Sequence, residues 1–180
     1  MDSDPIMPIN RAYRIDTIDN MENISVKFYT SSTLSAIRWI YCWSCSPVQH
    51  VRVEIEGLYY EINHKDCGRW IPVDMMPTED GYDLAIEVTL QVPESSINWD
   101  HIMAVSFDKK LSQLRMAAWG FLRGSKKFRS LPKPCPDCVS VAKDILGTIG
   151  ILCSGELPWE LYENLTTHYE HTEEKFRRFI

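Results

Sequence analysis

The sequence predicts an α+β domain in which a largely antiparallel sheet packs against helices. Segments that alternate apolar and polar residues fill the first half of the chain, and segments with helical apolar spacing dominate the second half. Two alternating segments meet at Gly57, which indicates a hairpin and therefore antiparallel pairing. A chain of 180 residues is long enough for one well-buried domain. We expect an N-terminal arm over residues 1–23 and a single domain over residues 24–180.

The predicted strands follow from two-residue periodicity. "ISVKFY" alternates, "HVRVEI" and "LYYEIN" alternate on either side of the turn, and "RWIPVDM" forms a short extended piece. "YDLAIEVTLQV" is rich in β-branched residues between Gly81 and Pro93, and "WDHIMAVSF" adds a further short strand. These strands cover residues 24–29, 49–55, 58–63, 69–75, 82–92 and 99–107.

The predicted helices follow from apolar residues spaced three and four apart. "LSAIRWIYCWSC" follows a run of Ser and Thr cap candidates, and "KLSQLRMAAWGFLRG" ends at a glycine. "CVSVAKDILG" carries an apolar stripe with Gly147 as its stop, and the last segment has Pro158 at a favourable first position. These helices cover residues 34–45, 110–124 and 138–147, and one or two more lie within 158–179.

Charge and hydropathy exclude several classes of partner. A net charge of −6 argues against nucleic acid, and the basic cluster at 123–129 is typical of a solvated loop. No stretch approaches the roughly 18 apolar residues that a membrane span needs. The first ten residues carry acids and prolines in place of a secretory signal, so we expect a soluble protein of the cytoplasm.

The six cysteines are expected to be thiols, because no secretory signal precedes them. Two pairs have metal-like or redox-like spacing, Cys42/Cys45 and Cys135/Cys138, and they leave a zinc module or a redox pair open as alternatives. The long separation between the pairs and the aromatic setting of the first disfavour zinc. We expect neither a metal nor an organic cofactor.

The hairpin brings polar side chains around one histidine. A two-residue turn at 56–57 places Arg52 opposite Glu61 and His50 opposite Asn63, with Glu61 as the diagonal neighbour of His50. All of them lie on the polar face of the strands. Two groups are thus available to orient an imidazole, as a general base requires.

Cys138 is the strongest candidate for a matching nucleophile. At the first turn of its helix it lies near the positive end of the macrodipole, which favours the thiolate. The unbonded N–H groups of that turn can also stabilise an oxyanion. The alternative is structural: Cys138 as a small core residue and His50 as a histidine on a surface strand.

Several segments together resemble one family. The stretch "SVKFYTSSTLSAIRWIYCWSCSPVQHVRVEIEGLYYEIN" contains an Arg38-Trp39 helix and a Ser46-Pro47 turn before His50. This order of strand, helix, turn and histidine resembles the opening of circularly permuted papain-like proteins of the NlpC superfamily. That branch includes small phage and bacterial proteins and the lecithin-retinol acyltransferase-like proteins. The likeness covers roughly residues 24–166 and continues through Gly57, Tyr60, "GRW" at 68–70, the helix ending at Gly124, "CVSVAKDILG" and "PWELYENL".

The resemblance implies a permuted papain-like fold and a cysteine hydrolase of the peptidase or amidase type. By position, Cys138 matches the nucleophile, His50 the base and Glu61 the orienting group, with Asn63 as the alternative third member. The bond cleaved would be an amide, isopeptide or ester in a peptide or acyl substrate. The host cytoplasm or a phage virion would be its location, with a virion or host protein as partner.

Departures from the family pattern leave the substrate open. Gln49 stands where the family commonly has Ser or Thr, and Val139 and Ser140 follow the cysteine where phage relatives often have Ser-Glu. The alternative function is a binding or virion-structural module with a vestigial site on the same fold.

Overall fold

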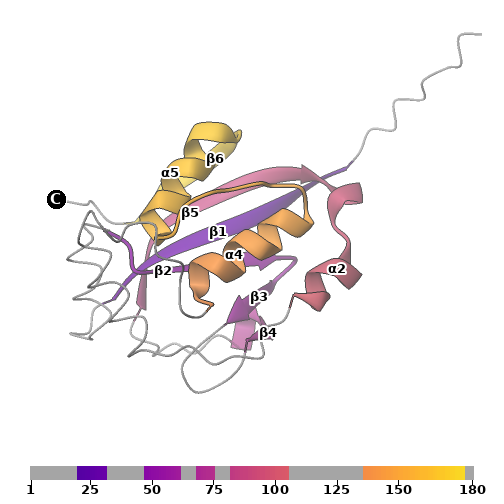
Figure 1. Cartoon of the computed structure of the whole chain (residues 1–180), viewed down its shortest axis with the longest axis horizontal. Helices are drawn as coiled ribbons and strands as arrows, with labels where there is room; N and C mark the ends of the chain where they lie inside the picture. Colours follow the sequence, from indigo (N-terminus) through magenta and orange to yellow (C-terminus); the bar gives the residue numbers. More distant parts are fainter. Residues whose placement is uncertain (1–19, 32–46, 62–67, 76–81, 106–135, 177–180) are drawn as a thin grey trace, which may run out of the picture.

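The protein contains a six-stranded antiparallel sheet with helices packed on it, which confirms the predicted α+β class (Figure 1). The computed structural model describes residues 20–31, 47–61, 68–75, 82–105 and 136–176. The strand order is β4-β3-β2-β1-β5-β6. The strands are β1 (Met21–Ser31), β2 (His50–Ile55), β3 (Leu58–Glu61), β4 (Arg69–Pro72), β5 (Tyr82–Pro93) and β6 (His171–Lys175). The helices are α2 (Trp99–Ala104), α4 (Cys138–Thr148) and α5 (Pro158–His168), with short 3-10 turns η1 (Val73–Met75) and η2 (Glu94–Ser96).

The long strand β1 lies at the centre of the sheet, between β2 and β5. Its alternate residues Ile24, Val26 and Phe28 have no solvent exposure, and their partners on both neighbouring strands are also apolar. This alternation gives one apolar face, as two-residue periodicity predicts. The strand begins at Met21, so residues 21–23 belong to the sheet and not to the predicted arm.

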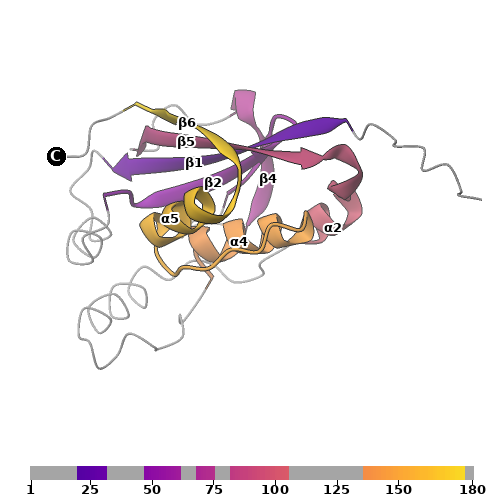
Figure 2. The ribbon, with the colours of Figure 1, turned by 90° about the horizontal axis from the view of Figure 1, so that it is seen from above.

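The apolar face of the sheet packs against α4 and α5. Figure 2 shows both helices on the same side of the strands, with α2 beyond the far end of α4. The core cluster joins sheet residues to Val139, Ile145 and Leu146 of α4 and to Leu161 and Leu165 of α5. Helix α4 packs on β2, and Cys138 at its start lies beside the first residues of that strand.

The turn between β2 and β3 is the predicted two-residue hairpin. Ile55 pairs with Leu58, and both turn residues have positive φ, 47° at Glu56 and 74° at Gly57. Positive φ at both positions defines a type I′ turn, whose twist matches that of the strands. The predicted register is therefore confirmed beside the turn, at Ile55↔Leu58 and Glu54↔Tyr59.

Residues 99–104 form a helix, so the predicted strand over 99–107 is wrong where the structure describes it. Asn98 caps this helix by accepting a hydrogen bond from the His101 backbone N–H at 3.2 Å. Ile102 is completely buried on its inner side. The capping asparagine outweighed a weak apolar alternation.

The predicted C-terminal helices are only half right. Pro158 is the first residue of α5, as predicted, but residues 171–175 form β6 and pair with β5. The sequence "HTEEK" has little intrinsic strand preference, so its conformation is set by the neighbouring strand. Helix α4 also continues past Gly147 to Thr148, and Gly150, with φ of 85°, follows its end.

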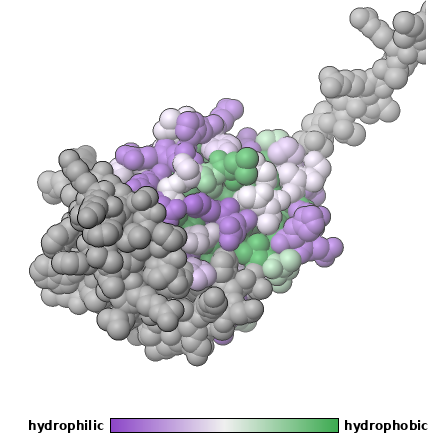
Figure 3. All heavy atoms as spheres, viewed as in Figure 1, coloured by the Kyte–Doolittle hydropathy of each residue, from purple (hydrophilic) through white to green (hydrophobic). Residues whose placement is uncertain are grey.

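Two predicted helices, at 34–45 and 110–124, lie outside the described residues, as does most of the arm. Figure 3 shows one face of the molecule, where hydrophobic residues form small groups among hydrophilic ones. Among the helices that the structure describes, none has the length and apolar character needed to cross a membrane.

Candidate active site

His50 is the first residue of β2, and its side chain is buried. Its exposed fraction is 7%, so it is not the surface-strand histidine that a purely structural interpretation predicted. The imidazole stacks on the Tyr82 ring at 4.8 Å between centroids, with 24° between the planes. Tyr29 lies on another side at 6.0 Å. Aromatic packing thus restricts the orientation of the ring.

Cys138 is the first residue of α4, as predicted. Asp137 is the N-cap, and its carboxylate accepts hydrogen bonds from the Ser140 backbone N–H and from Oγ, both at 2.9 Å. The first helical hydrogen bond runs from the Val141 N–H to the Asp137 carbonyl. The N–H groups of Cys138 and Val139 therefore have no partner within the helix, as is usual at a helix start.

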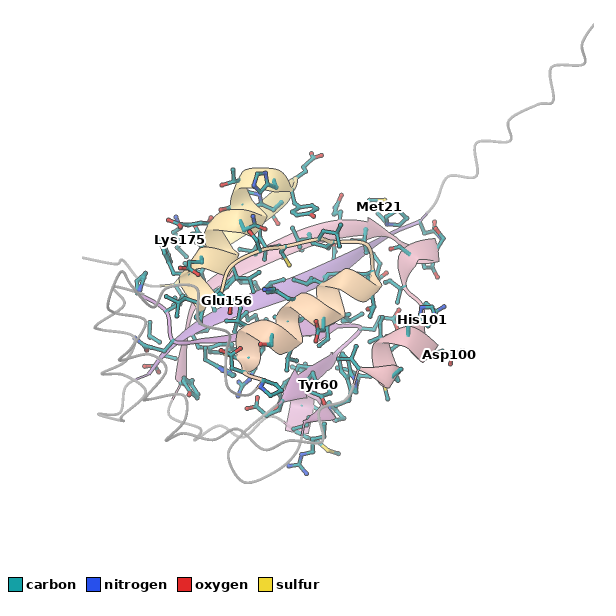
Figure 4. All side chains as sticks on the ribbon, in the orientation of Figure 1. Met21, Tyr60, Asp100, His101, Glu156 and Lys175 are labelled. Atoms are coloured by element: carbon teal, nitrogen blue, oxygen red, sulfur yellow. The ribbon has the colours of Figure 1, made fainter. Side chains whose placement is uncertain are left out.

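Cys138 and His50 line one small pocket. Four successive residues of β2 line it, together with Tyr60 of β3, which Figure 4 labels below α4. The printed pairs of the β2–β3 ladder, Ile55↔Leu58 and Glu54↔Tyr59, lie next to the turn. His50 lies at the opposite end of β2, away from these pairs. The pocket has no space for a water molecule, and the Cys138 residue is half-buried. The full lining is His50, Val51, Arg52, Val53, Tyr60, Cys138, Val141 and Ala142.

The surroundings of His50 favour its protonated form. Burial by itself lowers the pKa of a histidine, but attraction to the Cys138 sulfur and to Glu61 outweighs burial and raises the His50 pKa to about 9. An imidazole with this pKa carries a positive charge at neutral pH. The site therefore places a positively charged imidazolium beside the Cys138 sulfur.

Glu61 lies next to the Nε2 atom of the imidazole. Its Oε2 lies 3.8 Å from His50 Nε2, which is an ionic contact and longer than a hydrogen bond. The same oxygen accepts a hydrogen bond from Arg52 Nε at 2.7 Å. Burial raises the pKa of Glu61, but His50 and Arg52 together lower it below its usual value. Asn63, the alternative third member, lies outside the described residues.

Two residues beside His50 and Glu61, Arg52 and Tyr82, were not assigned to the site from the sequence. Arg52 has a signal in the sequence, because the predicted register already set it opposite Glu61. Tyr82 has none, because only the pairing of β5 with β1 brings it next to His50. Sequence reasoning identified groups within the hairpin and missed a group that arrives from a distant strand.

The alternatives based on metal or redox chemistry depend on cysteines 42, 45 and 135, which lie outside the described residues. Within the described ranges, no three His, Cys, Asp or Glu side chains lie close enough to hold a metal ion. Cys153, the other described cysteine, has a pKa raised by burial to about 11. A thiol with that pKa is a poor nucleophile at neutral pH.

Comparison of the chain with models of protein families, with curated proteins and with solved structures finds no match.

Proposed function

We propose that the protein is a cysteine hydrolase on a permuted papain-like fold, cleaving an amide, isopeptide or ester bond. The observation that carries this proposal is the shared pocket of Cys138 and His50, in which the sulfur is the largest of the effects that raise the His50 pKa. A nucleophile at a helix start, a base at a strand start and an orienting carboxylate, Glu61, make the set that such chemistry needs.

The reaction follows from the charges of the site. The Cys138 thiolate attacks the carbonyl carbon of the substrate, and a covalent C–S bond forms as the carbonyl oxygen becomes an oxyanion. The backbone N–H groups of Cys138 and Val139 stabilise that oxyanion. The His50 imidazolium then donates its proton to the leaving amine or alcohol as the scissile bond breaks. Water, deprotonated by the now neutral His50, attacks the thioester carbonyl; a C–O bond forms, the C–S bond breaks, the acyl group leaves as a carboxylic acid, and the thiolate and imidazolium are restored.

Substrate reaches the sulfur from the exposed side of Cys138. The pocket between Cys138 and His50 is too small even for water, so it positions the two catalytic groups and does not hold a substrate side chain. A small buried pocket of this kind keeps the imidazole close to the sulfur. The scissile carbonyl is then presented at the start of α4, where the two N–H groups point.

The first test is alkylation by iodoacetamide, followed cysteine by cysteine with peptide mass spectrometry. At pH 7 an ordinary thiol is only a few per cent ionised, so a Cys138 thiolate paired with His50 should react about tenfold faster or more. Cys153 is the matched control, because it is half-buried on the same part of the chain and its pKa is raised. His50→Gln should slow the reaction at Cys138 and leave Cys153 unchanged.

The second test is turnover on peptide, isopeptide and ester libraries. Cys138→Ala should abolish hydrolysis while the melting temperature stays within a few degrees of wild type. A Cys138 that reacts no faster than Cys153, in a protein that hydrolyses nothing, would instead support the binding or virion-structural module with a vestigial site.

A further inference from the structure

The guanidinium of Arg52 is held in a fixed position beside the candidate catalytic groups. Its side chain is only 3% exposed, and it lies over the rings of Tyr29 and Tyr59 at 4.9 and 5.1 Å. Its Nε donates a 2.7 Å hydrogen bond to the Oε2 of Glu61. A buried cation between two aromatic rings has little freedom to move.

The Glu61 carboxylate needs a permanent positive partner. It is mostly buried, with a side-chain exposure of 15%, and burial favours its neutral form. His50 supplies a positive charge only while it is protonated, and the proposed reaction removes that proton in one step and returns it in another. Arg52 stays charged throughout, because a guanidinium does not lose its proton in proteins.

We propose that Arg52 is the positioning residue of this site: it holds the Glu61 carboxylate ionised and in place beside His50 while the imidazole loses and regains its proton. This inference rests on the proposed function, since it assigns Arg52 a role in that proton cycle. The distances show that the shorter contact of Glu61 is the hydrogen bond from Arg52, and that His50 lies farther away, at the distance of an ionic contact.

Among the residues that the structure describes, few other charged groups face Glu61. On β2 these are His50 and Arg52, and from α4 Cys138 acts through His50. On β4, Arg69 is the direct pairing partner of Glu61, but it is exposed to solvent. Exposed cations are screened by water and contribute little, so Arg69 provides a matched control for loss of a positive charge.

The experiment measures the ionisation of Glu61 by carboxyl ¹³C NMR of the full chain, with the resonance assigned by Glu61→Gln. All proteins carry Cys138→Ala, which removes the sulfur and leaves Arg52 as the constant partner of the carboxylate. Arg52→Met should move the Glu61 titration midpoint upward by about one pH unit or more, the size expected for loss of an opposite charge at this distance. Arg52→Lys should leave the midpoint close to that of the parent, and Arg69→Met should not move it.

A midpoint that is the same with and without Arg52, or one that Arg69→Met moves equally, overturns the proposal. A measurement on wild type decides the case in which Arg52→Met does not fold. The ¹⁵Nε and ¹³Cζ signals of Arg52 should stay constant as the pH rises through the His50 pKa of about 9. A change in these signals at that pH would mean that Arg52 releases Glu61 when His50 loses its proton. None of these readouts uses turnover, so a protein without hydrolase activity leaves this test intact.

Discussion

The charge on His50 should make the stability of the protein fall as the medium becomes alkaline. In the folded protein the buried imidazole has a pKa of about 9, against an ordinary value of 6.5. Burial opposes this rise, and the attraction of Cys138 and Glu61 produces it. Between these two pH values the imidazole holds a proton in the folded chain and releases it in the unfolded chain, so the His50 contribution makes unfolding progressively more favourable.

The size of the effect follows from the two pKa values. A difference of about 2.5 pH units, at 1.36 kcal/mol for each unit, corresponds to about 3 kcal/mol. The folded-state pKa is the higher one, so this stabilisation is fully present below pH 6.5 and is lost as the pH rises through about 9. It is a large share of the roughly 5–15 kcal/mol that stabilises a typical domain.

The assay is urea unfolding of wild type and His50→Gln at a series of pH values from about 6 to about 10. Groups that do not interact with His50 are present in both proteins and cancel in the difference between the two curves, which therefore reports His50 together with the Cys138 side chain coupled to it. Cys138→Ala should show a smaller loss, because it removes the strongest effect that raises the pKa. If the stabilities of wild type and His50→Gln fall in parallel across this range, the imidazole is not charged in the folded protein and the proposed ion pair does not exist.

Three further predictions concern the same site. Asp137→Ala removes the N-cap of α4 and should cost about 0.5–2 kcal/mol in urea unfolding; an unchanged midpoint would contradict the capping role. Tyr82→Leu removes the ring stacked on His50 and should lower the histidine pKa measured by NMR, since an aromatic face stabilises the imidazolium; a constant pKa would show that the stack has no electrostatic effect. The double variant His50→Gln with Cys138→Ala should be destabilised by less than the sum of the single variants, by about 0.5–3 kcal/mol in a double-mutant cycle at pH 7; strict additivity would mean that the two groups do not interact.

Local patterns predicted the part of the site that lies within one hairpin. The turn at Gly57 and the alternation on both sides fixed the register, and the ion pair between Arg52 and Glu61 is its direct consequence. The helix start at Cys138 was also predicted, from the apolar stripe of its segment, and the structure adds Asp137 as the N-cap. These features depend on neighbours in the chain, where periodicity and turn chemistry are strong signals.

Contacts between distant segments could not be predicted from periodicity. The alternation of β2 assigned His50 to a solvated face, and its burial results from the packing of Tyr82 and of α4, which local sequence does not encode. β6 is a similar case, since its charged residues become a strand only by pairing with β5. The meeting of Cys138 with His50 was expected from a family resemblance and not from spacing. Tertiary contact therefore decides both the site and the sheet edge.

The charges of the site explain why these four residues belong together. In the form that the proposed reaction requires, a Cys138 thiolate and Glu61 would carry two negative charges and His50 and Arg52 two positive ones, so the cluster would be neutral. Removing one member shifts the protonation of its neighbour, as when His50 loses its proton without Cys138; where the neighbour keeps its charge, an unpaired charge remains and costs several kcal/mol. In the proposed acylation the sulfur loses its negative charge when the C–S bond forms, and His50 loses its positive charge when it donates its proton. One negative and one positive charge are therefore lost together. The pair of Arg52 and Glu61 then remains balanced by itself, and the site keeps its neutrality at each stage of the cycle.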